Sequence, residues 1–331
     1  MKILAVTNMY PTDDDPAFGV FVRSQMDSVA SLGHTVRVEV IRAHGKALVY
    51  VRAARRISAL VRHFMPDVVH AHYGLTGAAC AGVGAPLVIS FCGDDLLGTP
   101  NGRGGYTVRS RAGIVLSRIA ARSADAIICK SRELAEALPV ALRGRAHVVP
   151  NGVDTALFRP GDRLAARAAL GLDLRERVII FPHSLAQASR KRLDLAEAGI
   201  ARLAARGVGA RLWIVNGIPQ ANLPLYYQAA DCMLVTSDHE GSPNTVKEAI
   251  CCDVPVVTVD AGDAREQISD VAGCRLVERD PDAIATALEE TLARVGQVDG
   301  SSARSRLALD VVAGRVVEVY SEAVRRKLQR S

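Results

Sequence analysis

Short apolar stretches alternate with helix-like stretches along most of the chain, and this alternation constrains the fold more than any other sequence feature. Each apolar stretch is rich in Val, Ile and Leu and ends in a polar or glycine-containing loop. Strands of a parallel sheet have this composition because helices cover both faces of the sheet. We therefore predict an α/β fold of doubly wound parallel sheets. The predicted strands are residues 2–7, 35–41, 66–73, 87–91, 125–129, 178–181, 211–215, 231–237 and 254–259.

The chain of 331 residues is long enough for two domains of about 150 residues each. Near its middle, a strand ends in the turn Asn151-Gly152, with prolines at 150 and 160 on either side. Asn-Gly and proline together predict a stiff connection. We assign a first Rossmann-like domain to residues 1–155 and a second to residues 156–310. The last helix, at about 302–328, extends into a C-terminal segment, 311–331.

The stretch 238–249 lies between two predicted strands and carries two glutamates, Glu240 and Glu248. We expect a helix to begin here, with Ser242 as its cap and Pro243 in its first position. A helix N-terminus at the end of a parallel strand binds anions, phosphates above all. Carboxylates beside such a phosphate suit a nucleotide sugar. The alternative is a capped surface helix with two solvated acids, because short motifs give many false positives.

Three segments in order resemble the family 4 glycosyltransferases, especially bacterial transferases for surface polysaccharide or teichuronic acid. They are Lys191, residues 150–154 (Pro-Asn-Gly-Val-Asp), and the glutamate pair, which has seven residues between its members. The resemblance implies GT-B architecture, in which two Rossmann-like domains face each other across a cleft and the last helix crosses back to the first. It also implies retaining transfer of a sugar from a nucleotide sugar to an acceptor, without a metal.

The donor site follows from the same resemblance, which implies that Glu240 lies near the donor sugar and that Glu248 contacts the ribose. Three adjacent cations at 190–192 follow a strand and precede a helix, which suits a diphosphate. Lys191 matches the family's lysine. The family's earlier arginine is missing from residues 183–185, and we take Arg190 as its substitute. The other donor-binding candidates are Gly19, Ile218, Gly241, Ser242, Pro243, Asn244 and Thr245.

Gly19 follows the loop after the first strand, at the edge where doubly wound sheets bind ligands. A glycine there lets backbone approach a ligand closely. In the family, a glycine of this loop faces the donor diphosphate. A ligand role and a plain turn role for Gly19 stay open.

On the acceptor side, the candidates with a catalytic role are His72 and Asp95, together with Glu240 of the donor side. His72 ends a predicted strand, and the alternative is a hydrogen-bonded core histidine. Asp95 matches the family's Gly-Ser-Asp segment, although Cys92 stands where many relatives have histidine. In the loop that follows, we consider Arg103, Arg109 and Arg111 as contacts for a phosphorylated acceptor, against a solvated loop.

The positive charge lies in the first half of the chain. The net charge is +6, and residues 1–150 hold 18 Lys and Arg against 11 Asp and Glu, which is +7. Such a half suits an anionic partner, although solvated arginines explain it equally well. A basic face on the predicted helix 46–64 suits an anionic membrane surface or plain solvation. We expect a nucleotide-sugar donor, a lipid-linked or polysaccharide acceptor, and no nucleic acid.

Composition also bounds the compartment and the cofactors. No apolar run reaches the ~20 residues of a membrane span, and the N-terminus lacks a signal-peptide pattern. The seven cysteines are scattered without a Cys-x-x-Cys motif, which favours a reducing cytosol and gives no zinc site. We expect a cytoplasmic protein, with peripheral contact at the inner membrane face as a hypothesis. We expect no cofactor and no metal, with a UDP- or GDP-linked sugar as substrate.

Three other functions compete with this prediction. A nucleotide-sugar epimerase on the same fold would turn over the donor without an acceptor. A non-catalytic partner subunit would bind the donor without turnover, and Cys92 and the missing arginine favour it. An NAD-dependent dehydrogenase lacks support, because the glycines at 74, 77 and 82 do not form Gly-x-Gly-x-x-Gly.

Overall fold

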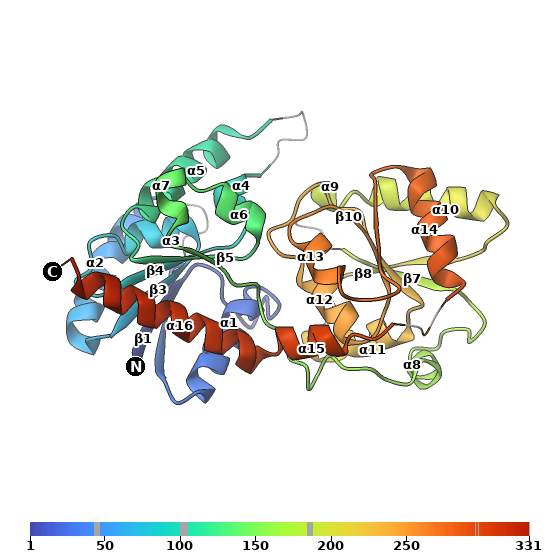
Figure 1. The fold of residues 1–331 in the computed structure, drawn as a ribbon, viewed down its shortest axis with the longest axis horizontal. Helices are drawn as coiled ribbons and strands as arrows, with labels where there is room; N and C mark the ends of the chain where they lie inside the picture. The colour runs from blue at the N-terminus through green and yellow to red at the C-terminus, as the bar shows by residue number, and fades with distance from the viewer. Residues whose placement is uncertain (43–46, 100–104, 184–187, 295, 297, 331) are drawn as a thin grey trace. The chain divides into compact units, whose positions relative to one another are not determined.

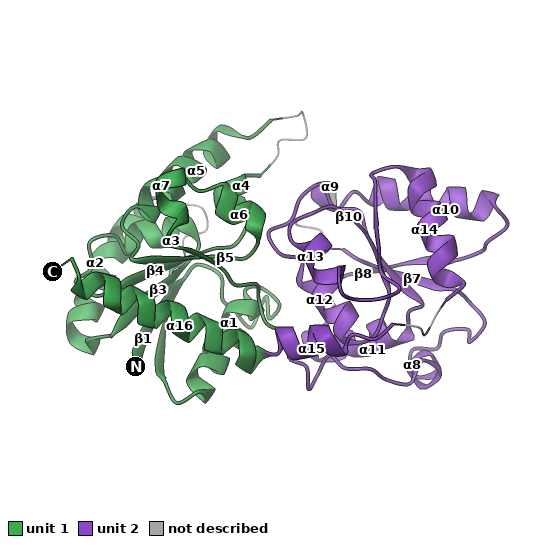
Figure 2. Ribbon diagram, viewed as in Figure 1, with its two compact units in different colours: residues 1–152, 309–331 green, residues 153–308 purple. Residues whose placement is uncertain are grey.

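The computed structural model describes residues 1–42, 47–99, 105–183, 188–294, 296 and 298–330. The chain forms two compact units (Figure 2). Unit 1 comprises residues 1–152 and 309–331, and unit 2 comprises residues 153–308. The first unit is therefore built from both ends of the chain.

Unit 1 contains a six-stranded sheet in the order β2-β1-β3-β4-β5-β6, and all of its strand pairs are parallel. Its strands are β1 (Lys2–Thr7), β2 (Thr35–Val40), β3 (Val68–His72), β4 (Leu87–Phe91), β5 (Ala126–Cys129) and β6 (Ala146–Val148). Its helices are α1 (Val20–Ser31), α2 (Ala47–Phe64), α3 (Gly74–Ala79), α4 (Asp94–Leu97), α5 (Val108–Ala121), α6 (Arg132–Glu136), α7 (Val140–Arg143) and α16 (Leu309–Leu328).

Helices cover both faces of this sheet (Figure 1), and a hydrophobic cluster fills the space between the sheet and the helices on each side. Residues of α2, α3 and α5 pack on one face together with Val69 and Ile89. Residues of α1 and α16 pack on the other face, where Val316 and Tyr320 join Ile3. The last helix thus supplies part of the core of the first unit.

Unit 2 contains a five-stranded parallel sheet in the order β11-β10-β9-β7-β8. Its strands are β7 (Val178–Pro182), β8 (Arg211–Val215), β9 (Cys232–Val235), β10 (Val256–Val259) and β11 (Arg275–Val277). Its helices are α8 (Arg163–Ala169), α9 (Ala188–Lys191), α10 (Leu193–Ala205), the 3-10 helix η2 (Gln220–Asn222), α11 (Leu223–Ala229), α12 (Asn244–Cys251), α13 (Ala264–Ile268), α14 (Pro281–Leu292) and α15 (Ser301–Leu307). One face packs on α10 and α14, and the other on α11, α12 and α15.

The prediction of two doubly wound parallel α/β domains is confirmed. In unit 2 the strand order changes direction at β7, which has β8 on one side and β9 on the other. Doubly wound sheets bind ligands outside the carboxyl ends of the strands at such a switch point. The loops after β7 and β9 are therefore where a ligand site belongs.

Two predicted helix boundaries are wrong. The helix predicted at 302–328 is broken at Ala308, which leaves helical geometry and forms an isolated parallel bridge with Val153. The Val153 amide donates to the Leu307 carbonyl at 2.8 Å. Helix α5 begins at Val108 rather than near residue 112, because the Thr107 hydroxyl caps it by accepting from the Ser110 amide.

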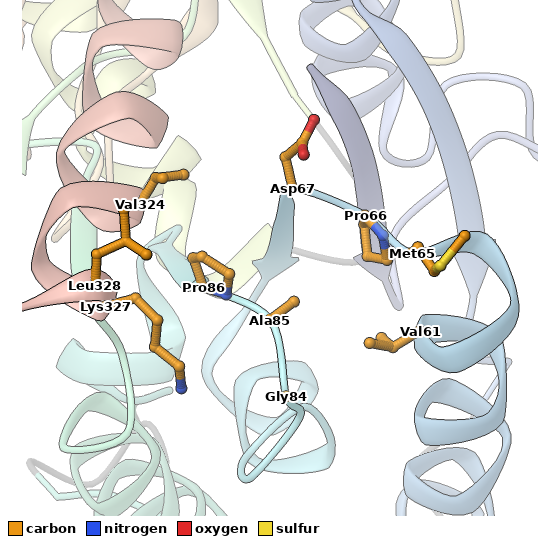
Figure 3. A pocket seen from close by; sticks show the side chains of 10 residues that line it. All are labelled: Val61, Met65, Pro66, Asp67, Gly84, Ala85, Pro86, Val324, Lys327 and Leu328. Atoms are coloured by element: carbon orange, nitrogen blue, oxygen red, sulfur yellow. The ribbon is translucent and has the colours of Figure 1, made fainter. Parts of the chain in front are cut away.

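A groove of about 470 Å³ lies at the amino-terminal edge of the unit 1 sheet (Figure 3). Residues at the end of α2 and at the end of α16 flank the loop that precedes β4. Its lining residues are Val61, Met65, Pro66, Asp67, Gly84, Ala85, Pro86, Val324, Lys327 and Leu328. Because ligand sites of this fold lie at the carboxyl edge, the groove is separate from the predicted site.

Candidate functional site

Three predicted site residues meet at the carboxyl ends of β7 and β9. The Lys191 ammonium donates to Oε1 of Glu240 at 2.8 Å. A guanidinium nitrogen of Arg190 lies 3.5 Å from Oε2 of the same carboxylate. The Ser237 hydroxyl also donates to Oε1, at 2.9 Å. Glu240 is only 7% exposed, so these partners replace water around its charge.

The charges of this cluster fix the protonation state of Glu240. Burial disfavours the ionised carboxylate, but the neighbouring charges of Lys191 and Arg190 outweigh it and hold the pKa of Glu240 below its usual value. Glu240 is therefore ionised at neutral pH. Two cations around one carboxylate leave an excess of positive charge, which suits a diphosphate.

Further contacts hold the segment 190–192, which follows β7, against the loop after β9. The Asp238 amide donates to the Arg190 carbonyl at 3.0 Å, and the Thr236 hydroxyl donates to the Lys191 carbonyl at 2.9 Å. Arg192 has a positive φ of 52°, which is uncommon for a residue with a side chain. Its guanidinium bonds Asp238 at 3.0 Å. These contacts join segments far apart in sequence, so no local pattern could indicate them.

The start of α12 differs from the prediction. The helix begins at Asn244 with Pro243 as its N-cap in extended conformation, and no side chain caps it. The prediction that Ser242 caps this helix is therefore wrong. The Ser242 hydroxyl instead donates to Oδ2 of Asp263 at 2.8 Å and accepts from the ammonium of Lys247 at 2.7 Å. Lys247 is fully buried, so this bond holds the loop before the helix from inside the unit.

The loop at Glu240 and Gly241 packs closely on the loop after β10. Gly262 has a φ of +62°, and a Cβ placed there would lie 2.9 Å from the Glu240 carbonyl oxygen. Only glycine fits both the conformation and the space. Within the donor loop, Gly241, Ser242, Asn244 and Thr245 remain partly exposed, whereas Pro243 is buried.

Glu248 lies on α12 with a partner from α11. Its Oε2 accepts from the Tyr227 hydroxyl at 2.9 Å. Burial raises the pKa of Glu248, and the Tyr227 hydrogen bond and Lys247 charge partly oppose that rise. Ile218, in the loop after β8, packs at the edge of the same core cluster as Trp213. Tyr227 was missed because its hydroxyl meets Glu248 only through the packing of two helices.

Gly19 has a structural explanation in unit 1. It is the N-cap of α1 with a φ of 71°. A Cβ there would lie 2.3 Å from the carbonyl carbon of Met9, so the loop's own backbone occupies the space. Of the two roles left open, this favours the turn, and a ligand role stays a prediction.

The two histidines of β3 have different environments. His70 bonds the Tyr320 hydroxyl and the Ser90 hydroxyl, each at 2.7 Å. His72 is fully buried, and in the part of the chain that the structure describes neither of its ring nitrogens has a hydrogen-bond partner. Burial, with a contribution from the charge of Lys130, lowers the pKa of His72 to about 3. His72 is thus a neutral imidazole, and no hydrogen bond among the described residues accounts for a polar ring at this buried position.

Asp95 ties together the loops after β3 and β4. Its carboxylate accepts backbone amides of Gly74 at 3.1 Å, Cys92 at 3.1 Å and Gly93 at 2.9 Å. Burial raises the pKa of Asp95 to about 6 despite these bonds. Burial also raises the pKa of Cys92 to about 12, so its thiol is neutral. A direct role of Asp95 toward an acceptor hydroxyl stays a prediction.

The remaining candidates divide by position. Arg109 and Arg111 lie exposed on α5, whereas Arg103 falls outside the described residues. Of residues 183–185, only His183 is described, and it follows β7. Within the described ranges, no group of three or more His, Cys, Asp or Glu side chains is arranged to hold a metal ion. Over the same ranges, no helix combines the length and the apolar character that crossing a bilayer requires.

Comparison with known families matches both parts of the chain. The family model "Glycosyltransferase Family 4" matches residues 6–157, and the model "Glycosyl transferases group 1" matches residues 188–294. The fold places the chain in the GT-B class. The chain belongs to the family 4 glycosyltransferases, as the sequence predicted.

The relatives differ in how much they share with the chain. A D-inositol 3-phosphate glycosyltransferase of Mycolicibacterium gilvum is 30% identical over 69% of this chain and 59% of its own length. The putative teichuronic acid biosynthesis glycosyltransferase TuaC of Bacillus subtilis is 25% identical over 79% of this chain and 82% of its own. The first two curated relatives are thus matched over only 59% and 47% of their length.

Solved structures share the fold across the whole chain. Sucrose-phosphate synthase of Thermosynechococcus elongatus superposes with a TM-score of 0.79 and 17% identity, and covers all of both chains. HepE of Anabaena, solved with UDP and glucose, superposes with a TM-score of 0.70 and 17% identity over 97% of this chain and 99% of its own. At these identities the likeness establishes the fold alone.

Proposed function

We propose that this chain transfers a sugar from a nucleotide-sugar donor to an acceptor hydroxyl, with retention of configuration and without a metal ion. The observation that carries this proposal is the contact of Lys191 and Arg190 with Glu240 at the switch point of unit 2. A diphosphate leaving group and a sugar that becomes electron-poor both need fixed charges of opposite sign at close range. This cluster holds both signs on one edge of the sheet.

Each donor-side residue has a role that its position supports. Lys191 and Arg190 bind the leaving diphosphate, with the N-terminus of α12 as a further positive end. Glu240, held ionised by these cations, stabilises positive charge that develops on the sugar. Glu248 accepts from the ribose hydroxyls, and Tyr227 keeps its carboxylate oriented.

The acceptor belongs to unit 1, where His72 and Asp95 lie at the carboxyl edge of the sheet. We infer a lipid-linked or polysaccharide acceptor, with the protein in the cytoplasm at the inner membrane face. One named relative uses D-inositol 3-phosphate, so a small phosphorylated acceptor is the second class to test. UDP-sugars are the first donors to test, because HepE was solved with UDP.

The test begins with donor binding measured by thermal unfolding against UDP-, GDP- and ADP-sugars. A ligand at 100 times its dissociation constant stabilises the fold by ~2.7 kcal/mol. We expect one nucleotide to stabilise the native chain but not Glu248→Ala, and to stabilise the control Arg202→Ala, whose side chain is exposed on α10. Absence of any shift contradicts the proposal.

Turnover then separates the competing functions. Incubation of the binding donor with each acceptor class should yield a glycoside with the donor's anomeric configuration. Conversion of donor without acceptor identifies an epimerase. Donor binding without any turnover identifies a partner subunit.

A further inference from the structure

Helix α5 of unit 1 exposes an apolar stripe to solvent. Its inner side buries Ser117, Ala120 and Ala121. Its outer side carries Val108, which is 85% exposed, and Ile119, which is 51% exposed, with Val115 between them. The spacing of these three positions places them on one line along the helix. Exposed apolar side chains gathered on one side of a helix and bordered by polar residues are typical of an interaction surface.

Exposed arginines lie beside this stripe. Arg111, Arg118 and Arg122 are exposed on one flank of the stripe. In the described part of the chain, none of their guanidinium groups forms an ion pair. Residues 96–124 hold five arginines and no Asp, Glu or Lys, which gives this segment a net charge of +5. This face therefore suits an anionic partner.

Helix α2 also carries exposed arginines and exposed apolar side chains, and it packs on the same face of the sheet as α5. Residues of α2, α3 and α5 belong to one hydrophobic cluster on one face of the sheet, so their outer sides lie on the same side of unit 1. Arg52, Arg55 and Arg62 are exposed on α2, together with the apolar side chain of Leu48. The sequence has no acid from residue 40 to residue 66. Two helices of this layer thus combine exposed arginines with exposed apolar side chains.

We propose that the outer face of α5 docks on the surface of an anionic lipid bilayer. Val108, Val115 and Ile119 enter the interfacial region, and Arg111, Arg118 and Arg122 bind lipid phosphates. Amphipathic helices of this composition lie in the plane of the membrane surface, bound by apolar burial and by attraction to anionic lipids. The apolar stripe favours a lipid over a nucleic acid, whose backbone offers no apolar layer.

Docking through α5 brings the acceptor edge of unit 1 to the bilayer. The Thr99 amide, just after α4, donates to the Ser110 hydroxyl of α5 at 2.8 Å. Gly74 packs directly on Ser117, since a Cβ at Gly74 would lie 2.0 Å from the Ser117 hydroxyl oxygen. The loops after β3 and β4 are thus fixed to α5. Access to a lipid-anchored acceptor rests on the proposed function, whereas the docking itself does not.

The test is co-sedimentation of the full chain with vesicles of phosphatidylcholine alone and of phosphatidylcholine with phosphatidylglycerol. We expect binding only to the anionic vesicles, weakened by salt. One variant joins Val115→Glu and Ile119→Glu, and another joins Arg111→Glu, Arg118→Glu and Arg122→Glu. Each should bind about tenfold more weakly, because both the apolar and the charged contacts contribute.

Matched controls separate this face from general charge and hydrophobicity. Leu164→Glu changes a side chain that is 53% exposed on α8 of unit 2. Arg175→Glu, Arg202→Glu and Arg294→Glu together change the net charge as much as the α5 arginine variant does. Both controls should bind vesicles like the native chain. Thermal stabilisation by the donor should be the same in every variant, which keeps this test apart from that of the glycosyl transfer.

Four results would overturn the docking proposal. They are no binding of the native chain to anionic vesicles, equal loss in the controls, a native dimer that Ile119→Glu dissociates, and RNA that competes with vesicles for the face. If the double glutamate variant does not fold, Val115→Ser with Ile119→Ser tests the stripe in the same assay.

Discussion

The ammonium nitrogen of Lys191 lies 2.8 Å from a carboxylate oxygen of Glu240, although the two residues are 49 positions apart in sequence. The contact joins the end of α9, the helix that follows β7, to the loop after β9, and β7 and β9 are neighbouring strands of unit 2. It places a cation and a carboxylate together at the edge where this fold binds ligands. The pair also means that each residue sets the electrostatic state of the other.

Replacing Lys191 with methionine should lower kcat by about 10²–10³-fold, the usual loss when one donor to a developing charge is removed. The side chain keeps its length, so the fold should remain. Steady-state kinetics with the donor that binding identifies will measure kcat. The control variant is Arg202→Met. A variant with native kcat would show that Lys191 does not act on the leaving group.

Removing the Tyr227 hydroxyl should weaken donor binding. In Tyr227→Phe, Glu248 loses the hydrogen bond of 2.9 Å that the Tyr227 hydroxyl donates, and hydrogen bonds to charged groups are worth about 1.5–3 kcal/mol. We expect the donor dissociation constant to rise about tenfold, since part of this energy is recovered by water. Isothermal titration checks it, and an unchanged constant would mean that Tyr227 does not orient the carboxylate.

Two glycines with positive φ form a matched pair. A Cβ at Gly262 would lie 2.9 Å from the Glu240 carbonyl oxygen. A Cβ at Gly207, which has a φ of +82°, would meet no atom within 4 Å. Both alanine variants carry a backbone cost of about 1–3 kcal/mol. Only Gly262→Ala also displaces the Glu240 loop, so only it should lose activity. Denaturant unfolding measures the stability of both variants, and steady-state kinetics measure their activity. Equal activity in the two variants would contradict a role of Gly262 in placing the Glu240 loop.

Replacing the two neighbouring histidines with phenylalanine should change the unfolding free energy to different extents. His70→Phe removes two hydrogen bonds of 2.7 Å and leaves two hydroxyls without a partner, which should cost about 2–5 kcal/mol of unfolding free energy. His72→Phe removes no hydrogen bond, and its stability should stay close to native. If His72 acts on the acceptor, His72→Phe loses activity while it stays folded; native activity would assign it to the core alone.

The ionisation of Asp95 should appear in the pH dependence of stability. Its folded pKa of about 6 lies above the ordinary value of 3.8, which corresponds to about 3 kcal/mol. The folded state binds the extra proton, so this contribution is fully present below about pH 4 and is lost as pH rises through about 6. Unfolding free energies from pH 3 to 8, for the native chain and Asp95→Asn, should show the step only in the native chain. A parallel pair of curves would contradict it.

The sequence predicted the sheets well because buried parallel strands leave a local signal. Strands such as β4, β5, β7 and β9 are short runs of mostly apolar residues. Glu240 falls on the loop after β9 and Glu248 on the helix that follows it, as expected. The predicted helix starts near residue 112 and at residues 242–243 and the unbroken helix at 302–328 were wrong. The observed start at Asn244 and the break at Ala308 depend on contacts with segments far away in sequence. The Ser242 hydroxyl donates to Asp263 and does not cap the backbone of α12. Ala308 pairs with Val153, 155 positions away in sequence. Tyr227 and Lys247 act through side chains that no spacing rule connects to the motif.

The discontinuity of unit 1 has a consequence for synthesis on the ribosome. The sheet face that α16 covers stays open until α16 has left the ribosome, because Val316 and Tyr320 complete the core there. Unit 2 is continuous in sequence and is whole well before that. Domains usually fold in the order of their synthesis. In this protein the order is reversed, because residues 1–152 are made before unit 2 but belong to the unit that is completed after it.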